Sequence, residues 1–155
     1  MKNISTICLA ISIAFLPWVE VVDGKSKIAK YAPKGYIHPI DAIFIREKVG
    51  NSNTAYKWEG VYRADPNNPK IKAELKSVGK NDEYGICYAA VSVYEQQLKS
   101  LGINEIQSLG NGGLFSYMIR DRQGKQWQVM VSCGSIHEEA IKSTKFSASI
   151  STPGG

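Results

Sequence analysis

The sequence predicts an α+β domain in which one long amphipathic helix packs on an antiparallel sheet. Three observations lead to this prediction. Residues 83–101 carry an apolar stripe at helical spacing, and residues 114–121 and 125–133 alternate as two strands joined by a short turn. In addition, one cysteine lies on the helical stripe and another on the apolar face of the second strand.

The long helix is the clearest element. Its stripe consists of Cys87, Ala90, Val91, Tyr94, Leu98 and Leu101. Gly102 stands where a left-handed residue ends a helix, and Ile103 follows as the residue that packs back on Leu98. The sequence therefore predicts a helix over about 83–101 with a glycine stop.

The hairpin over 114–121 and 125–133 has a turn that begins at Asp121 and ends at Gly124. In its second strand, Trp127, Val129, Val131 and Cys133 share one face. A helix packed on that face would bring Cys87 close to Cys133, so we expect a Cys87–Cys133 disulfide that joins helix and sheet.

The other segments are less regular. Residues 38–50 combine helix-start signals at Pro39 and Asp41 with a stop at Gly50, yet Ala42 to Ile45 reads equally as a strand, and both alternatives stay open. We further expect a strand over 56–63, a helix over 69–78 after Asn68, a short helix over 137–143 and a last strand through Phe146, Ala148 and Ile150.

Residues 1–24 are typical of a secretory signal peptide. Lys2 is followed by an apolar run from Ile4 to Phe15, and Gly24 suits the position before a cleavage site. A retained membrane anchor is the alternative. We expect a basic, loosely held N-terminal arm over 25–37, a single α+β domain over 38–151 and a flexible tail over 152–155. The mature chain has no second run of spanning length, so we expect it in the periplasm or outside the cell.

Composition narrows the class of protein. The 155 residues are 43% hydrophobic and 21% charged, with a net charge of +5, which excludes a disordered chain. Three cysteines are too few for a disulfide-dense scaffold or a zinc cluster. An oxidising compartment favours pairing of the two cysteines that remain after signal removal.

No catalytic set is convincing, and no metal or cofactor is expected. Cys87 near a helix start, with His137 as base, suits a cysteine hydrolase. His38 and His137 as acid and base would suit a ribonuclease. Cys133 and His137 have a spacing compatible with metal ligands, but two ligands make no site.

Binding is the stronger hypothesis. The lysines Lys72, Lys76 and Lys80 form a basic helical surface that suits an acidic partner, and Tyr56, Trp58 and Tyr62 are aromatic candidates for the same role. Arginine is scarce, which makes nucleic acid an unlikely partner.

The order helix, loop, strand, turn and strand over 84–133, with Asp121, Gly124 and Trp127, resembles the PepSY-like extracytoplasmic modules. The resemblance implies a helix on a hairpin and a role in binding or restraining partner proteins. We therefore expect a small secreted or periplasmic bacterial protein that binds another protein, as an inhibitor, an immunity-type protein or an envelope accessory protein. A secreted hydrolase is the alternative.

Overall fold

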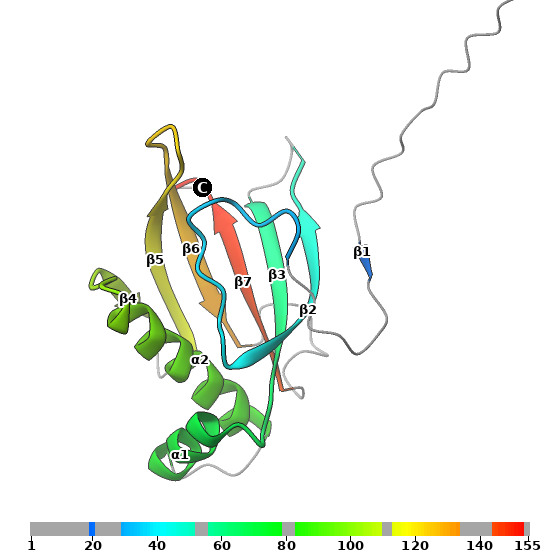
Figure 1. The fold of residues 1–155 in the computed structure, drawn as a ribbon, viewed down its shortest axis with the longest axis vertical. Helices are drawn as coiled ribbons and strands as arrows, with labels where there is room; N and C mark the ends of the chain where they lie inside the picture. Colours follow the sequence, from blue (N-terminus) through cyan, green and yellow to red (C-terminus); the bar gives the residue numbers. More distant parts are fainter. Residues whose placement is uncertain are drawn as a thin grey trace, which may run out of the picture.

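The computed structural model describes residues 19–20, 29–51, 56–78, 83–109, 113–133 and 144–153 (Figure 1). Most of the predicted signal peptide, Lys80, His137 and the expected helix over 137–143 lie outside the described residues. The α+β class is confirmed: within the described residues, two helices accompany one antiparallel sheet. The elements are β1 (Val19–Glu20), β2 (Ala42–Val49), β3 (Tyr56–Ala64), α1 (Pro69–Val78), α2 (Glu83–Ser100), β4 (Ile106–Ser108), β5 (Leu114–Arg120), β6 (Gln126–Ser132) and β7 (Lys145–Ser151).

The described strands form one sheet in the order β1-β2-β3-β7-β6-β5-β4. Every neighbouring pair is antiparallel. Strand β7, which comes last along the chain, lies in the centre between β3 and β6. The ends of β2, β5 and β7 therefore meet the beginnings of β3 and β6 at one end of the sheet.

Residues 42–49, for which helix and strand were both open, form strand β2. The strand pairs with β3 from Ala42 opposite Ala64 to Val49 opposite Trp58, with an irregularity between Phe44 and Arg46. Pairing decides the conformation here. Phe44 contacts the ring of Tyr62 on the same face, with ring centroids 5.5 Å apart, and the backbone gains a ladder of hydrogen bonds.

Helix α2 buries most of the predicted stripe, because Cys87, Ala90, Val91, Tyr94 and Leu98 are all buried. Leu101 lies beyond the end of the helix and is exposed.

The predicted glycine stop of this helix is confirmed. Gly102 has a φ of +87°, its N–H donates to the carbonyl of Lys99 at 3.0 Å, and the N–H of Ile103 donates to the carbonyl of Leu98 at 3.1 Å. Helix α1 covers the predicted range and begins after Asn68, whose side-chain oxygen accepts the N–H of Lys70 at 2.9 Å.

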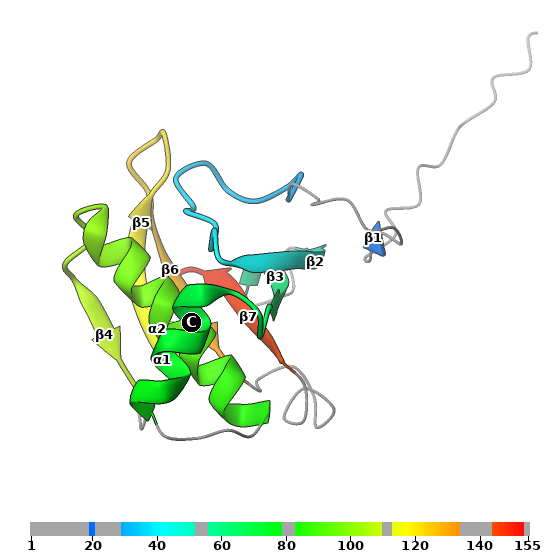
Figure 2. The same cartoon turned by 60° about the horizontal axis from the view of Figure 1, so that its bottom comes forward.

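One face of the sheet, called here the inner face, forms the core together with α2. Its largest buried side chains are Trp58, Tyr62, Phe115, Tyr117, Phe146 and Ile150. The predicted disulfide is confirmed: Cys87 at the start of α2 is bonded to Cys133 just after β6. Figure 2 shows α1 and α2 against each other at one end of the molecule.

Residues 29–41, called here the strap, cross the inner face from the end away from the helices down to α2 (Figure 1). The sequence predicts a loosely held arm over 25–37. The described part of that arm is held firmly instead, because the Tyr36 ring is buried against Trp58, with ring centroids 4.9 Å apart. Helix α2 and the strap therefore both cover the inner face.

Candidate binding surface and the strap beneath it

The strap is tied to the sheet by one buried carboxylate. Glu47 on β2 is only 6% exposed. It accepts the backbone N–H of Lys30 at 2.8 Å, that of Tyr31 at 3.0 Å and the indole N–H of Trp58 at 2.7 Å. Three donors compensate much of the cost of burying this charge.

Polar side chains from three elements hold the middle of the strap. The Nδ1 atom of His38 lies 2.7 Å from the hydroxyl of Tyr62 on β3. The hydroxyl of Tyr94 on α2 donates to the carbonyl of Ile37 and lies 2.9 Å from the hydroxyl of Tyr117 on β5. The strap is therefore fastened to both the helix and the sheet.

Gln97 on α2 binds the C-terminal part of the strap through both the nitrogen and the oxygen of its side-chain amide. Its Nε2 donates to the carbonyl of His38 at 2.9 Å, and its Oε1 accepts the N–H of Ile40 at 3.0 Å. Such a two-point contact fixes the backbone of the strap more closely than a single bond would.

Burial sets the protonation of this cluster. Burial raises the pKa of the Tyr62 and Tyr94 hydroxyls, and also that of Tyr36 and Tyr117. Burial lowers the pKa of His38, against the opposing effect of the Glu47 carboxylate. At neutral pH the hydroxyls and the imidazole are uncharged, so the strap rests on a neutral hydrogen-bonded layer.

The candidate catalytic residues are not assembled into a site in the described part of the chain. Cys87 is bonded to Cys133 and offers no thiolate, which a cysteine hydrolase needs as its nucleophile. His38 lies under the strap beside Tyr62, and His137 is outside the described residues.

The described residues hold neither a cluster of metal ligands nor a membrane-spanning helix. They contain no group of three or more His, Cys, Asp or Glu side chains that could hold a metal ion. Within that same part of the chain, no helix has the length and apolar character that crossing a membrane requires.

The predicted binding surface needs correction. Trp58 and Tyr62 are 0% and 1% exposed, because both project from β3 onto the inner face, so they belong to the core. Tyr56 is half-buried, and Lys72 and Lys76 are exposed on α1 as expected.

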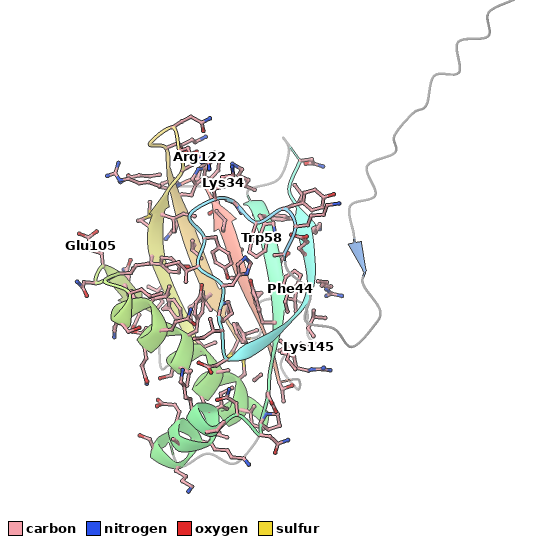
Figure 3. The ribbon with its side chains drawn as sticks, viewed as in Figure 1. Lys34, Phe44, Trp58, Glu105, Arg122 and Lys145 are labelled. Carbon is pink, nitrogen blue, oxygen red and sulfur yellow. A yellow bond between two sulfur atoms is a disulfide. The ribbon has the colours of Figure 1, made fainter. Side chains whose placement is uncertain are left out.

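A stronger concentration of positive charge lies at the other end of the molecule. Six exposed cations from the strap, β3, β5 and the β5–β6 turn lie where these segments meet, and we call this set the basic end: Lys30, Lys34, Lys57, Arg120, Arg122 and Lys125. Figure 3 shows Lys34 and Arg122 close together at this end, and Lys145 at the opposite one.

The strap and the hairpin come into direct contact in the basic end. A side-chain carbon at Gly35 would lie 3.0 Å from the carbonyl oxygen of Arg120, so only glycine allows the two segments to approach this closely. The ammonium groups of Lys57 and Lys125 each lie 4.3 Å from the ring centroid of Trp127. These contacts gather cations from distant parts of the chain.

Asp121, in the turn between β5 and β6, lies among the cations of the basic end and accepts three hydrogen bonds. Asp121 accepts the indole N–H of Trp127 at 2.9 Å and the N–H groups of Gln123 and Lys125 at 3.0 and 2.9 Å. The bond from Trp127 is the main cause that lowers the pKa of Asp121. Lys57 also attracts this carboxylate, but one negative charge among six cations leaves a net positive charge at this end.

The α1 surface differs in this respect. Lys70 forms an ion pair with Asp41 at 2.9 Å, and Glu74 lies between the exposed lysines in sequence. The lysines of α1 are close together in the sequence and were therefore predicted as a basic surface. The cations of the basic end are scattered between residues 30 and 125, so no local pattern revealed them. No family model, curated protein or solved structure matches this chain.

Proposed function

We propose that this chain is a small exported protein that acts by binding a protein partner with an acidic surface, and that the basic end is the contact surface. Export rests on the signal-peptide pattern of residues 1–24, and the Cys87–Cys133 disulfide is in keeping with an oxidising compartment. Cleavage after Gly24 would remove β1, which pairs with β2 only at Arg46 and Glu47.

The gathering of six exposed cations at one end of the sheet is the observation that supports the proposal. Such a surface raises the rate of encounter with an acidic partner and disfavours basic partners. Four of the six are lysines, which attract carboxylates as point charges but do not offer the bidentate geometry that reads bases or phosphates. A protein partner is therefore favoured over nucleic acid.

Tyr94 on α2 contacts β5, with its ring centroid 5.7 Å from that of Phe115 and its hydroxyl 2.9 Å from that of Tyr117, and Cys87 joins α2 to Cys133 just after β6. These contacts support the PepSY-like arrangement that residues 84–133 resemble. In this proposal the helix, the hairpin and the disulfide form the rigid support on which the Asp121–Gly124 turn is presented. Rigid support favours binding, because less conformational freedom is lost when the partner docks.

The test is a binding titration with a matched pair of charge-reversal variants. The probe is a fluorescein-labelled deca-aspartate peptide, followed by anisotropy at an ionic strength of about 0.1 M. Lys34→Glu with Arg122→Glu alters the basic end, and Lys72→Glu with Lys76→Glu makes the same change in net charge on α1. Both pairs are exposed, so neither is expected to disturb folding.

We expect the first variant to weaken binding by about tenfold or more, since four units of charge change next to the ligand. If the basic end is the contact surface, the second variant changes charge at the other end of the molecule. Salt screening over about 10 Å should then limit its effect on affinity to less than about threefold. A larger loss in the α1 variant would place the contact on α1. Tighter binding of a DNA duplex of equal charge would contradict a protein partner.

A further inference from the structure

We propose that the strap is a pH-sensitive closure: protonation of His38 releases it from the inner face, and acidification thereby weakens binding at the basic end. The second half of this inference rests on the proposed function. The first half concerns the strap alone and can be tested without any partner.

The seat of the His38 ring is built for a neutral imidazole. Aromatic rings surround it, with centroids 4.7 Å away for Tyr36, 6.1 Å for Trp58, 6.2 Å for Tyr62 and 6.4 Å for Phe44. In a neutral ring Nδ1, which lies 2.7 Å from the Tyr62 hydroxyl, accepts or donates according to the tautomer. In a protonated ring both nitrogens are donors, so the Tyr62 oxygen must accept from Nδ1 while a charge is buried.

The groups that face His38 give limited compensation for that charge. The tyrosines around it, contributed by the strap, β3, α2 and β5, are neutral: Tyr36, Tyr62, Tyr94 and Tyr117. The carboxylate of Glu47 on β2 favours the charged imidazole, but it already accepts three hydrogen bonds from the strap and Trp58. Burial outweighs it and lowers the pKa of His38.

The sign of the effect follows from linkage. In the released strap His38 is in water, with an ordinary pKa of about 6.5. Because the docked pKa is lower, docking is fully favoured above about pH 6.5 and loses stability as the pH falls. Each pH unit below 6.5, down to the docked pKa, favours release by about tenfold.

Release of the strap would change the basic end directly. The strap contributes Lys30 and Lys34 to it, and Gly35 lies against the carbonyl of Arg120. Loss of two of the six cations reduces the local positive potential. The strap therefore couples the protonation of a half-buried imidazole to the charge of a surface on which a partner would dock.

The experiment is hydrogen–deuterium exchange of peptides that cover 29–41, at pH 7.5 and pH 5.0, corrected for intrinsic exchange rates. We expect strap protection in the wild type to be lower at pH 5.0 than at pH 7.5, while amides of β6 keep theirs. His38→Asn, whose side-chain oxygen can take the place of Nδ1, should lose the pH response. His137→Gln, which removes the other histidine, should retain it.

Each outcome decides a different point. Strap protection that is independent of pH in the wild type overturns the closure, whatever the variants do. A response abolished by His137→Gln but kept by His38→Asn overturns the role of His38. If His38→Asn fails to dock the strap at pH 7.5, His38→Gln serves as the second non-titrating variant and the wild-type profile still decides.

Anisotropy with the deca-aspartate probe at both pH values separates the two proposals. Strap release with no probe binding at either pH leaves the closure standing and contradicts the proposed function. Probe binding that is unchanged while the strap opens overturns the coupling between them.

Discussion

Removal of the Cys87–Cys133 bond should destabilise the domain by about 4 kcal/mol. The bond closes a loop with a sequence separation of 46, which contains most of α2 and the strands β4, β5 and β6. The chain-entropy relation for a loop of that length gives about 13 cal/mol/K, or about 4 kcal/mol at 25 °C. This is a large fraction of the roughly 5–15 kcal/mol that stabilises a typical domain.

Urea unfolding of the wild type, of the reduced wild type and of the Cys87→Ala/Cys133→Ala variant measures this quantity. Alkylation before and after reduction first verifies that both thiols are blocked in the purified protein. The reduced protein and the double variant should agree to within about 1 kcal/mol, because the missing cross-link is what they share. A loss below about 1.5 kcal/mol with an unchanged dependence on urea would refute the argument.

Two further predictions concern individual carboxylates. Glu47→Ala should lower the free energy of unfolding in urea by about 3 kcal/mol, because it leaves the buried indole N–H of Trp58 and two backbone donors without their acceptor. The control is Glu59→Ala, also on a strand but partly exposed, which should lower it by less than about 1 kcal/mol. Because the pKa of Asp121 is lowered in the folded state, its contribution to stability is complete above the unfolded pKa of about 3.9 and disappears as the pH falls through the folded pKa. Asp121→Asn should therefore lower the urea midpoint at pH 6, and the difference between the variant and the wild type should shrink below about pH 4.

Local sequence patterns were enough to predict the parts of the fold that depend on interactions between residues close together in the chain. The spacing of apolar residues marked the buried face of α2, and Gly102 marked its end. The disulfide followed from two such patterns taken together, because Cys87 and Cys133 each lie on a core-facing surface. Neither inference required knowledge of the strand order.

The features that the sequence left open or misassigned depend on contacts between distant segments. The strap is fixed by Glu47 and Gln97, whose roles no local pattern reveals. Trp58 and Tyr62 looked like candidates for an exposed aromatic surface, but their alternation on β3 places both on the inner face. Residues 42–49 carried helix and strand signals of similar strength, and pairing with β3 decided between them.

The central position of β7 has a consequence for how the chain reaches this structure. Synthesis proceeds from the N-terminus, so residues 145–151 are available later than every other described strand, yet they join β3 on one side to β6 on the other. Until they arrive, the chain can form a β2–β3 ladder and a β4–β5–β6 ladder. The edges at β3 and β6, which β7 later covers, are then open to pairing with other chains. The whole sheet can therefore form only after β7 has been synthesised. Keeping the open edges of β3 and β6 away from other chains until then would protect the protein from aggregation.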